Sequence, residues 1–293
     1  MARLEVGTYH IPVMLRECME WLRPSENGLY VDGTLGGGGH TAELLKSGAR
    51  VIAFDADEEA IRHCRERFAS ETNLTLVHAN FESMPEVLKD EHPNGVLLDL
   101  GVSSFQFDHH QRGFSYRMQA PLDMRFSPDG LTAADILNTS SVEEIVRLLK
   151  AYGEEPMAWR IAEAIVQRRS LAALRSTADL RDVVIQVIPP QHQPKTMARV
   201  FQALRIATNK ELERLEGVLR GVAPLLAPYG RIVVMSYHSL EDRIVKSVFK
   251  EMSDERLVSV LTKKPVEPDR EEVAKNPRSR SARLRVCERI FAA

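Results

Sequence analysis

The sequence predicts an α/β fold of the Rossmann-like type, in which a mainly parallel sheet is interrupted by an inserted helical domain. Five short apolar runs have the character of buried parallel strands: residues 29–32, 49–55, 74–80, 95–99 and 231–237. The first run leads directly into the glycine-rich turn Gly36–Gly39, and a helical pattern follows at once. A strand, a glycine turn and a helix N-terminus together open a nucleotide-binding βαβ unit.

The helical insert is predicted from the long interval between the fourth and fifth strands. This interval spans about 130 residues, and a βαβ crossover needs only a dozen or so beyond its helix. Its helical patterns have recognisable start and stop signals and cover residues 141–153, 156–169 and 176–188. We therefore expect the nucleotide-binding domain to comprise residues 1–106 and 209–293, and the helical domain residues 107–208.

The glycine turn favours S-adenosylmethionine over a dinucleotide. The dinucleotide fingerprint G-x-G-x-x-G fails from Gly36, because His40 and Thr41 stand at its end, and from Gly33, because Leu35 replaces the second glycine. An acid followed by alternate glycines, as in Asp32, Gly36 and Gly38, fits the S-adenosylmethionine loop, although Thr34 replaces its first glycine. A tight βα turn without a ligand is the alternative, but four consecutive glycines would loosen such a turn for no benefit.

Three further side chains are expected at the carboxyl ends of strands, where open parallel sheets bind ligands. Asp55 ends the second strand, 22 positions after Gly33, near the spacing at which a carboxylate meets ribose hydroxyls. Phe81 follows the third strand and either packs on an adenine ring or belongs to the core. Asp99 ends the fourth strand, where a carboxylate can bind the ammonium group of the cofactor or a substrate amine.

The composition indicates a soluble, reduced, cytoplasmic protein. The chain has 293 residues, 44% of them hydrophobic and 27% charged, with a net charge of −2, as in ordinary globular proteins. The three cysteines form no C-x-x-C motif and no disulfide framework. We see neither an N-terminal apolar signal nor a run of 18 apolar residues, so no membrane association is expected.

Local basic patches favour a polyanionic partner, since the net charge alone predicts no gross attraction to nucleic acid. Residues 157–214 contain ten bases and five acids. The C-terminal segment carries Arg278, Arg280, Arg283 and Arg285 within eight residues that include no acid. Such patches suit phosphate backbones, although a solvated helix face and a mobile loop are the structural alternatives.

Two polar stretches are hard to explain by structure alone, residues 112–125 and 236–243. Ser239 to Asp242 has the form of a helix-starting box, which leaves His238 and Arg243 without a structural explanation. The pair His109–His110 invites a metal site, but no cysteine or third spaced ligand accompanies it, so we expect no metal.

These stretches together resemble the MraW family of ribosomal RNA small subunit methyltransferases. The similar motifs are residues 10–14, 32–40, 99–104, 112–115, 121–125, 152–155, 201–206, 238–246, 262–265 and 276–281. The resemblance implies a class I S-adenosylmethionine-dependent methyltransferase fold and methylation of N4 of a cytidine in the decoding centre of 16S rRNA, within the small ribosomal subunit. No obligate protein partner is implied.

The resemblance also assigns residues. It places the cofactor contacts at Gly38, Gly39, His40, Asp55, Phe81, Asp99 and Gln106. Phe105 and Phe107 flank Gln106 where many relatives have proline and leucine, so the geometry of that loop is open. Together with the patches it makes Arg125, Arg243, Arg278 and Arg280 the expected RNA-binding residues.

The catalytic acceptor for the cytosine amine is not identified by a familiar motif. Many amino-methyltransferases carry Asn/Asp-Pro-Pro-aromatic at the fourth strand, whereas this chain has Asp99-Leu-Gly-Val. We expect Asp123, or a group in the turn from His238 to Arg243, to orient the amine. The alternatives are a methyltransferase of another RNA, a protein or a small amine, and a non-catalytic RNA-binding assembly factor; a dehydrogenase fits least.

Overall fold

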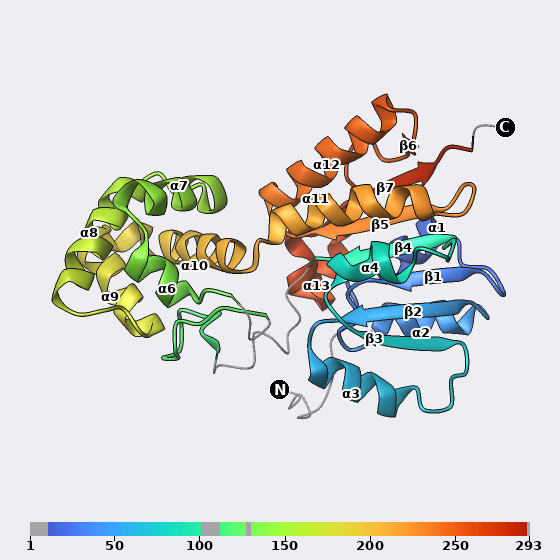
Figure 1. Ribbon diagram of the computed structural model, residues 1–293, viewed down its shortest axis with the longest axis horizontal. Helices are drawn as coiled ribbons and strands as arrows, with labels where there is room; N and C mark the ends of the chain where they lie inside the picture. Colours follow the sequence, from blue (N-terminus) through green and yellow to red (C-terminus); the bar gives the residue numbers. More distant parts are fainter. Residues whose placement is uncertain (1–10, 101–111, 127–129, 292–293) are drawn as a thin grey trace. The chain divides into compact units, whose positions relative to one another are not determined.

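The computed structural model describes residues 11–100, 112–126 and 130–291 (Figure 1). The chain forms two compact units. The first comprises residues 1–103 and 212–293, and the second residues 104–211. Each unit is described by itself below.

The first unit is built on a seven-stranded sheet with the order β3-β2-β1-β4-β5-β7-β6 (Figure 1). Its strands are β1 (Leu29–Asp32), β2 (Arg50–Asp55), β3 (Leu74–His78), β4 (Gly95–Asp99), β5 (Arg231–Ser236), β6 (Val258–Val260) and β7 (Arg283–Arg289). The first five strands pair in parallel, whereas β7 runs antiparallel to both β5 and β6. This is the predicted class I methyltransferase fold, although the strand patterns did not reveal its last two strands, β6 and β7.

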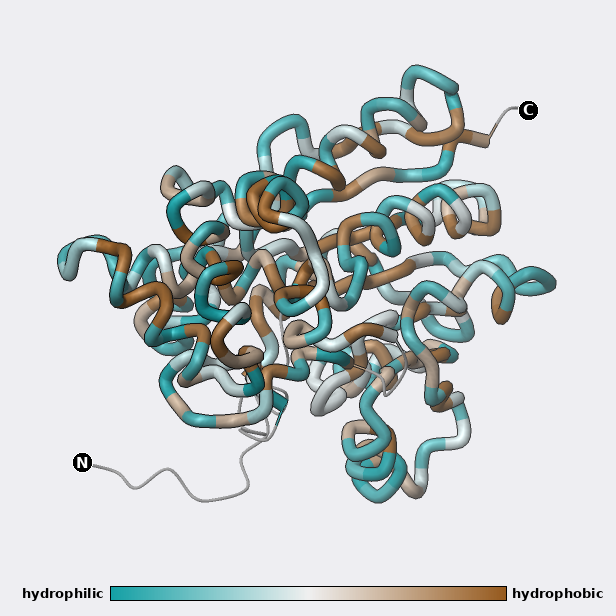
Figure 2. Tube along the Cα trace, turned by 60° about the vertical axis from the view of Figure 1, so that its left-hand side comes forward, coloured by the Kyte–Doolittle hydropathy of each residue, from teal (hydrophilic) through white to brown (hydrophobic). Residues whose placement is uncertain are grey.

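Helices cover both faces of this sheet, because each contributes one apolar side to a core layer. One layer joins the sheet to α1 (Leu15–Leu22), α2 (Gly39–Lys46) and α3 (Glu58–Arg67). The other joins it to α4 (Met84–Val87), α11 (Glu211–Val222) and α12 (Ser239–Asp254). Hydrophobic and hydrophilic residues alternate along these helices (Figure 2). None of the described helices is both long and apolar enough to cross a membrane.

The parallel strands end in register, and this collects polar side chains at one edge of the sheet. Asp32 lies opposite Ala53 of β2 and Leu97 of β4, so β1 ends close to the ends of its two neighbours. Asp99 lies opposite Met235, one residue before the end of β5. The carboxyl edge, where open parallel sheets bind ligands, therefore carries the ends of β1, β2, β4 and β5.

The second unit is helical, as predicted. It contains α6 (Ala133–Thr139), α7 (Val142–Gly153), α8 (Ala158–Leu171), α9 (Thr177–Val187), η3 (Pro190–His192) and α10 (Gln193–Asn209). Thr132, Ser141 and Ser176 begin α6, α7 and α9 with capping boxes. The long α10 lies before α11, and Lys210 in the left-handed conformation (φ 50°) separates the two.

The polar stretch from Arg112 to Phe126 is an ordered part of the helical unit. Asn209 at the end of α10 is buried; its amide group donates to Met124 O (2.8 Å) and accepts from Phe126 N (2.8 Å). Leu122 N donates to Arg175 O at 2.9 Å. Buried polar groups that are satisfied in this way hold irregular backbone in one conformation.

Candidate active site

The glycine turn after β1 adopts a backbone that side chains disfavour. Gly36 and Gly38 have φ of 49° and 73°, in the left-handed region that glycine enters without penalty. A Cβ built on Gly38 would lie 2.6 Å from Cε2 of Phe68. The turn therefore depends on glycine at Gly38 for two separate reasons, conformation and space.

The end of α3 supports the glycine turn from the protein side. The Cys64 thiol donates to Gly36 O at 3.4 Å, and the Arg67 guanidinium donates to Gly37 O. The same guanidinium lies 4.9 Å from the ring centroid of Phe68, a cation–π geometry. These contacts satisfy two carbonyls of the turn. No local sequence signal indicated this role for Cys64 or Arg67.

Asp32 ties the two ends of the turn together. Its buried carboxylate accepts from Thr34 N at 3.1 Å and from the Thr41 hydroxyl at 2.7 Å. Burial raises the pKa of Asp32. His40, a predicted cofactor contact, is buried, and its Nε2 lies 3.0 Å from Val13 O. His40 therefore links the start of α2 to the segment before α1.

Asp55 receives a backbone N–H of the glycine turn. Its carboxylate accepts from Gly36 N and from Asp57 N, each at 2.8 Å. Burial raises the pKa of Asp55 to about 6, although the two backbone hydrogen bonds work in the opposite direction. The structure thus places this carboxylate directly beside the turn, as expected of a ribose-binding acid.

Asp99 at the tip of β4 is joined to the same turn through its backbone. Asp99 N donates to the Thr34 hydroxyl at 2.7 Å, so the threonine in place of the expected glycine connects β1 to β4. Burial, followed by the negative charge of Asp99 and a hydrogen bond to it, raises the pKa of Tyr237 well above its ordinary value. Tyr237 consequently stays a neutral hydroxyl beside the Asp99 carboxylate, a role that sequence reasoning missed.

Phe81 begins η1 (Phe81–Ser83), just after β3. Its side chain is partly buried and packs against the core layer that contains α4 and α11. A partly buried ring of this kind is compatible both with packing on an adenine ring and with a place in the core.

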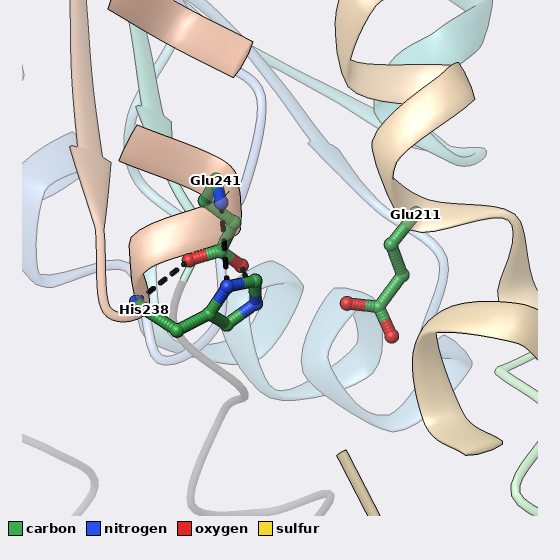
Figure 3. Close-up of side chains that lie close together, drawn as sticks. All are labelled: Glu211, His238 and Glu241. Carbon is green, nitrogen blue, oxygen red and sulfur yellow. Dashed lines mark hydrogen bonds and ion pairs between the residues drawn. The ribbon is translucent and has the colours of Figure 1, made fainter. Parts of the chain in front are cut away.

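His238 is the N-cap of α12. The expectation that helix capping does not account for His238 is therefore wrong. Glu241 N donates to His238 Nδ1 at 3.3 Å, and the Glu241 carboxylate accepts from His238 N at 3.3 Å (Figure 3). The same carboxylate accepts from Tyr237 N at 2.8 Å. The box begins one residue before Ser239, because an unprotonated imidazole nitrogen can accept a backbone N–H. In the neutral ring the proton is then on Nε2, 3.1 Å from Glu241 Oε1.

Comparison with known proteins identifies the family. Residues 7–290 match the model of the MraW methylase family. The chain belongs to this family. The ribosomal RNA small subunit methyltransferase H of Halothermothrix orenii is 44% identical, over 96% of this chain and 99% of that protein. The protein of the same name from Heliobacterium mobile is 45% identical, over 96% and 99%.

As a member of the MraW methylase family, the chain is an S-adenosylmethionine-dependent methyltransferase, and the site fits this cofactor. The cofactor supplies an electrophilic methyl group on a sulfonium. Gly36 and Gly38 give a backbone without Cβ atoms that a ligand can approach closely. Asp55 and Asp99 present carboxylates at the same edge of the sheet, which are chemically suited to ribose hydroxyls and to an ammonium group. Gln106, the remaining predicted contact, lies outside the described residues.

The candidate catalytic residue Asp123 belongs to the helical unit and is paired with Arg125. Its carboxylate accepts from Arg125 Nε (2.8 Å), Arg125 Nη2 (2.9 Å) and Arg125 N (3.1 Å). The Arg125 hydrogen bond, despite partial burial, holds the pKa of Asp123 below its usual range. Asp123 is therefore a hydrogen-bond acceptor at neutral pH and a poor proton acceptor, and Arg125 serves to position it.

Several members of the predicted basic patches have internal partners. In the helical unit, Arg169 donates to Leu137 O and Ser140 O, and Arg205 is paired with Glu211. Arg285 is buried in β7 and paired with Asp242 at 2.6 Å, so the C-terminal segment is not a uniformly basic tail. Arg243, Arg278 and Arg280 are exposed, and all three belong to the methyltransferase unit.

The raised pKa of Asp55 predicts a pH dependence of cofactor binding. Ribose hydroxyls that donate to Asp55 favour its ionised form, so binding should release a proton and the affinity for S-adenosylmethionine should rise with pH through about 6. Calorimetry should find an affinity about tenfold weaker at one pH unit below that pKa than well above it. Without cofactor the sign is opposite: the raised pKa of Asp55 makes the fold lose stability as pH rises from the ordinary carboxyl pKa to about 6, and no further loss from this group follows above that pH.

Asp55→Asn is the control for this prediction, because it removes the titrating group and keeps a hydrogen-bond acceptor for Gly36 N. Its affinity should be lower and independent of pH between 5 and 7. An unchanged pH profile in Asp55→Asn would assign the titration to another group, of which buried Asp32 is the first candidate.

Proposed function

We propose that this protein transfers a methyl group from S-adenosylmethionine to N4 of a cytidine in the decoding centre of 16S rRNA, within the small ribosomal subunit. The observation that supports this most is the match to the MraW methylase family over residues 7–290. Relatives that are 44% and 45% identical over nearly their whole length are named ribosomal RNA small subunit methyltransferase H. That the cytosine amine accepts the methyl group is inferred from the motifs that resemble those of the family.

The reaction is a displacement at the sulfonium methyl, so the protein has mainly to position the nucleophile in line with it. The lone pair of the cytosine amine is delocalised into the ring, and an acceptor for an amine proton helps to localise it. At the carboxyl edge of the sheet, Asp99 is held by Thr34 and lies beside Tyr237. We therefore assign the Asp99 carboxylate to the ammonium group of the cofactor. Another group has to accept the hydrogen bond from the cytosine amine.

Asp123 is our first choice for that acceptor and Glu241 our second. Asp123 already accepts three hydrogen bonds from Arg125, and two carboxylate oxygens offer about four lone-pair sites in total. One site is therefore left for an amine proton. Glu241, in the turn that His238 caps, is buried and receives two backbone N–H groups. A base must leave its stack to reach such groups inside a protein.

Replacing Asp123 with asparagine should slow single-turnover methylation about a hundredfold, since one side of the new group donates where the carboxylate accepts. The measurement is transfer of labelled methyl to unmethylated small subunits at saturating cofactor. Arg125→Gln is the matched variant, because it removes the same pair and leaves the carboxylate. Equal losses in both variants would show that the pair only stabilises the structure, and full activity of Asp123→Asn would exclude Asp123 as the acceptor.

The experiment that tests the function identifies the product. S-adenosylmethionine with a labelled methyl group is incubated with small ribosomal subunits that lack their modifications, and the RNA is digested to nucleosides. Label in N4-methylcytidine is the expected result. Label in another nucleoside, or in a ribosomal protein, would overturn the proposal while leaving the methyltransferase chemistry intact. A protein that binds RNA without transferring any methyl group would be the assembly factor considered above.

A further inference from the structure

Four exposed basic side chains surround the start of β7 in the methyltransferase unit. Lys263 and Lys264 lie in the connection that follows β6, and Arg278 and Arg280 lie in η5 (Pro277–Ser281), which leads into β7. We call these four residues the basic rim. Sequence reasoning had singled out only the two arginines and had placed them in a tail.

Hydrogen bonds fix the backbone that carries the two lysines. The Thr262 hydroxyl accepts a hydrogen bond from Val286 N at 2.8 Å. Val266 and Leu284 exchange two backbone hydrogen bonds of 2.9 Å. Residues 263–265 therefore form a short bulge held at both ends against β7. The lysine side chains are exposed, and the segment that carries them is tied to β7 at both ends.

The arginine part of the rim is equally well anchored. Ser279 between Arg278 and Arg280 is fully buried, and Ala282 N donates to Ser279 O at 2.7 Å. Arg280 is thus only four residues before Leu284, which pairs with Val266 at the end of the lysine bulge. Both parts of the rim consequently flank the first residues of one strand.

The rim borders the edge of the sheet that carries the cofactor site. Arg283 at the start of β7 lies opposite Ser236 at the carboxyl end of β5. Before η5, α13 (Arg270–Lys275) contacts the segment that precedes α1: Met14 N donates to Glu272 Oε1 at 2.6 Å. The neighbouring Val13 O is the partner of His40 in the cofactor site. A chain bound along the rim would therefore pass beside the methyl donor.

Three acids near the rim are paired with other cations. Asp269 lies 3.6 Å from Arg16, and Glu271 lies 2.5 Å from Lys275. Asp242 is engaged by Arg285 and Arg283. In contrast, Lys263, Lys264 and Arg280 form no ion pair with any residue that the structure describes. These three side chains therefore keep their positive charge for a partner.

We propose that the basic rim binds the phosphate backbone of the RNA substrate and so directs one strand past the cofactor site. This inference rests on the proposed function for the identity of the RNA. Lysine ammonium groups act as point charges on phosphates, and arginines on a fixed helix can bind phosphate oxygens in a bidentate manner. Phosphate contacts of this kind fix the position of the nucleic acid, whereas base contacts specify its sequence.

The test compares two double variants of the full chain. Lys263→Gln/Lys264→Gln removes two charges from the rim, and Lys46→Gln/Lys250→Gln removes two exposed lysines that are paired with Glu43 and Asp254. The probe is a transcript of the small-subunit rRNA, and its affinity is measured by filter binding over a range of salt concentrations. The rim variant should bind on the order of tenfold more weakly, with a salt slope lower by about 1.5. The control variant should match the wild type, and both should bind S-adenosylmethionine normally.

The outcomes separate this inference from the proposed function. Equal losses in the two double variants would mean that only net charge matters, and the rim would be no binding site. An unchanged salt slope in the rim variant would also overturn the inference. So would a rim variant that keeps its affinity for RNA but no longer binds an acidic polypeptide. The identity of the methylated nucleoside is determined on the wild-type protein, so an unexpected product would refute the proposed function while a weakened rim variant still supports the rim.

Discussion

Replacing Gly38 with alanine is expected to weaken S-adenosylmethionine binding more than a hundredfold. Gly38 has φ 73°, a conformation that costs an alanine about 1–2 kcal/mol. Its new Cβ would lie 2.6 Å from the Phe68 ring, and such overpacking costs about 1–3 kcal/mol more. The turn can escape both costs only by moving, and movement displaces the backbone that faces the cofactor. Calorimetric titration with S-adenosylmethionine measures the loss.

Two other glycines make this a graded series with its own controls. Gly36→Ala meets only Thr34 O at 3.9 Å, so at φ 49° it has the conformational cost without the clash and should show an intermediate loss. Gly217 lies within α11 with nothing within 4 Å of an added Cβ, and alanine there should stabilise the protein by up to about 1 kcal/mol. Equal affinities in Gly38→Ala and Gly217→Ala would show that the turn does not hold the cofactor.

The parts of the site that the sequence predicted are those with local signals. Strands buried on both faces are continuous apolar runs, and a left-handed turn requires glycine, so β1, β4 and the turn between β1 and α2 could be placed from residue order alone. The acids Asp55 and Asp99 followed from the rule that ligands bind where parallel strands end. The structure confirms their position at the carboxyl edge.

Contacts between distant segments could not be predicted in the same way. Cys64 and Arg67 support the glycine turn from 28 and 30 residues away, and the spacing of α3 alone does not reveal this. His238 was expected to need a functional explanation because the helix-starting box was placed at Ser239 to Asp242, yet its Nδ1 accepts the N–H of Glu241. Tertiary partners, rather than propensities, decide the roles of these residues.

The strand β7 shows how charge can hide a periodic pattern. From Arg283 to Val286, arginine alternates with an aliphatic residue, which is the two-residue period of a strand. The basic residues nearby favoured a phosphate-binding tail instead. Arg285 is nevertheless 6% exposed, because Asp242 on α12 neutralises it. Only the partner, 43 residues away in the sequence, distinguishes a buried arginine from one that binds RNA.

Removing Asp242, the partner of Arg285, should also have a large effect. The variant Asp242→Ala is expected to destabilise the methyltransferase unit by about 3–5 kcal/mol, because it leaves Arg285 buried without a counter-charge. Asp242 accepts from Arg285 Nε at 2.6 Å and from Arg285 Nη2 at 3.1 Å. Burial works to raise the pKa of Asp242, but Arg285 and then Arg283 hold it below its usual value. The stabilisation is therefore present above the ordinary carboxyl pKa and is lost as pH falls through the depressed one.

Urea unfolding in a Trp159→Phe background measures this loss, since Trp21 on α1 then reports the methyltransferase unit alone. Arg283→Gln is the matched control: its side chain is 43% exposed and lies 3.4 Å from Asp242, so it should cost less than about 1 kcal/mol. Replacing both partners, as Asp242→Leu with Arg285→Met, should recover most of the loss, because no buried charge remains unpaired. If the double variant were as unstable as Asp242→Ala, shape rather than charge would hold the start of α12 against β7.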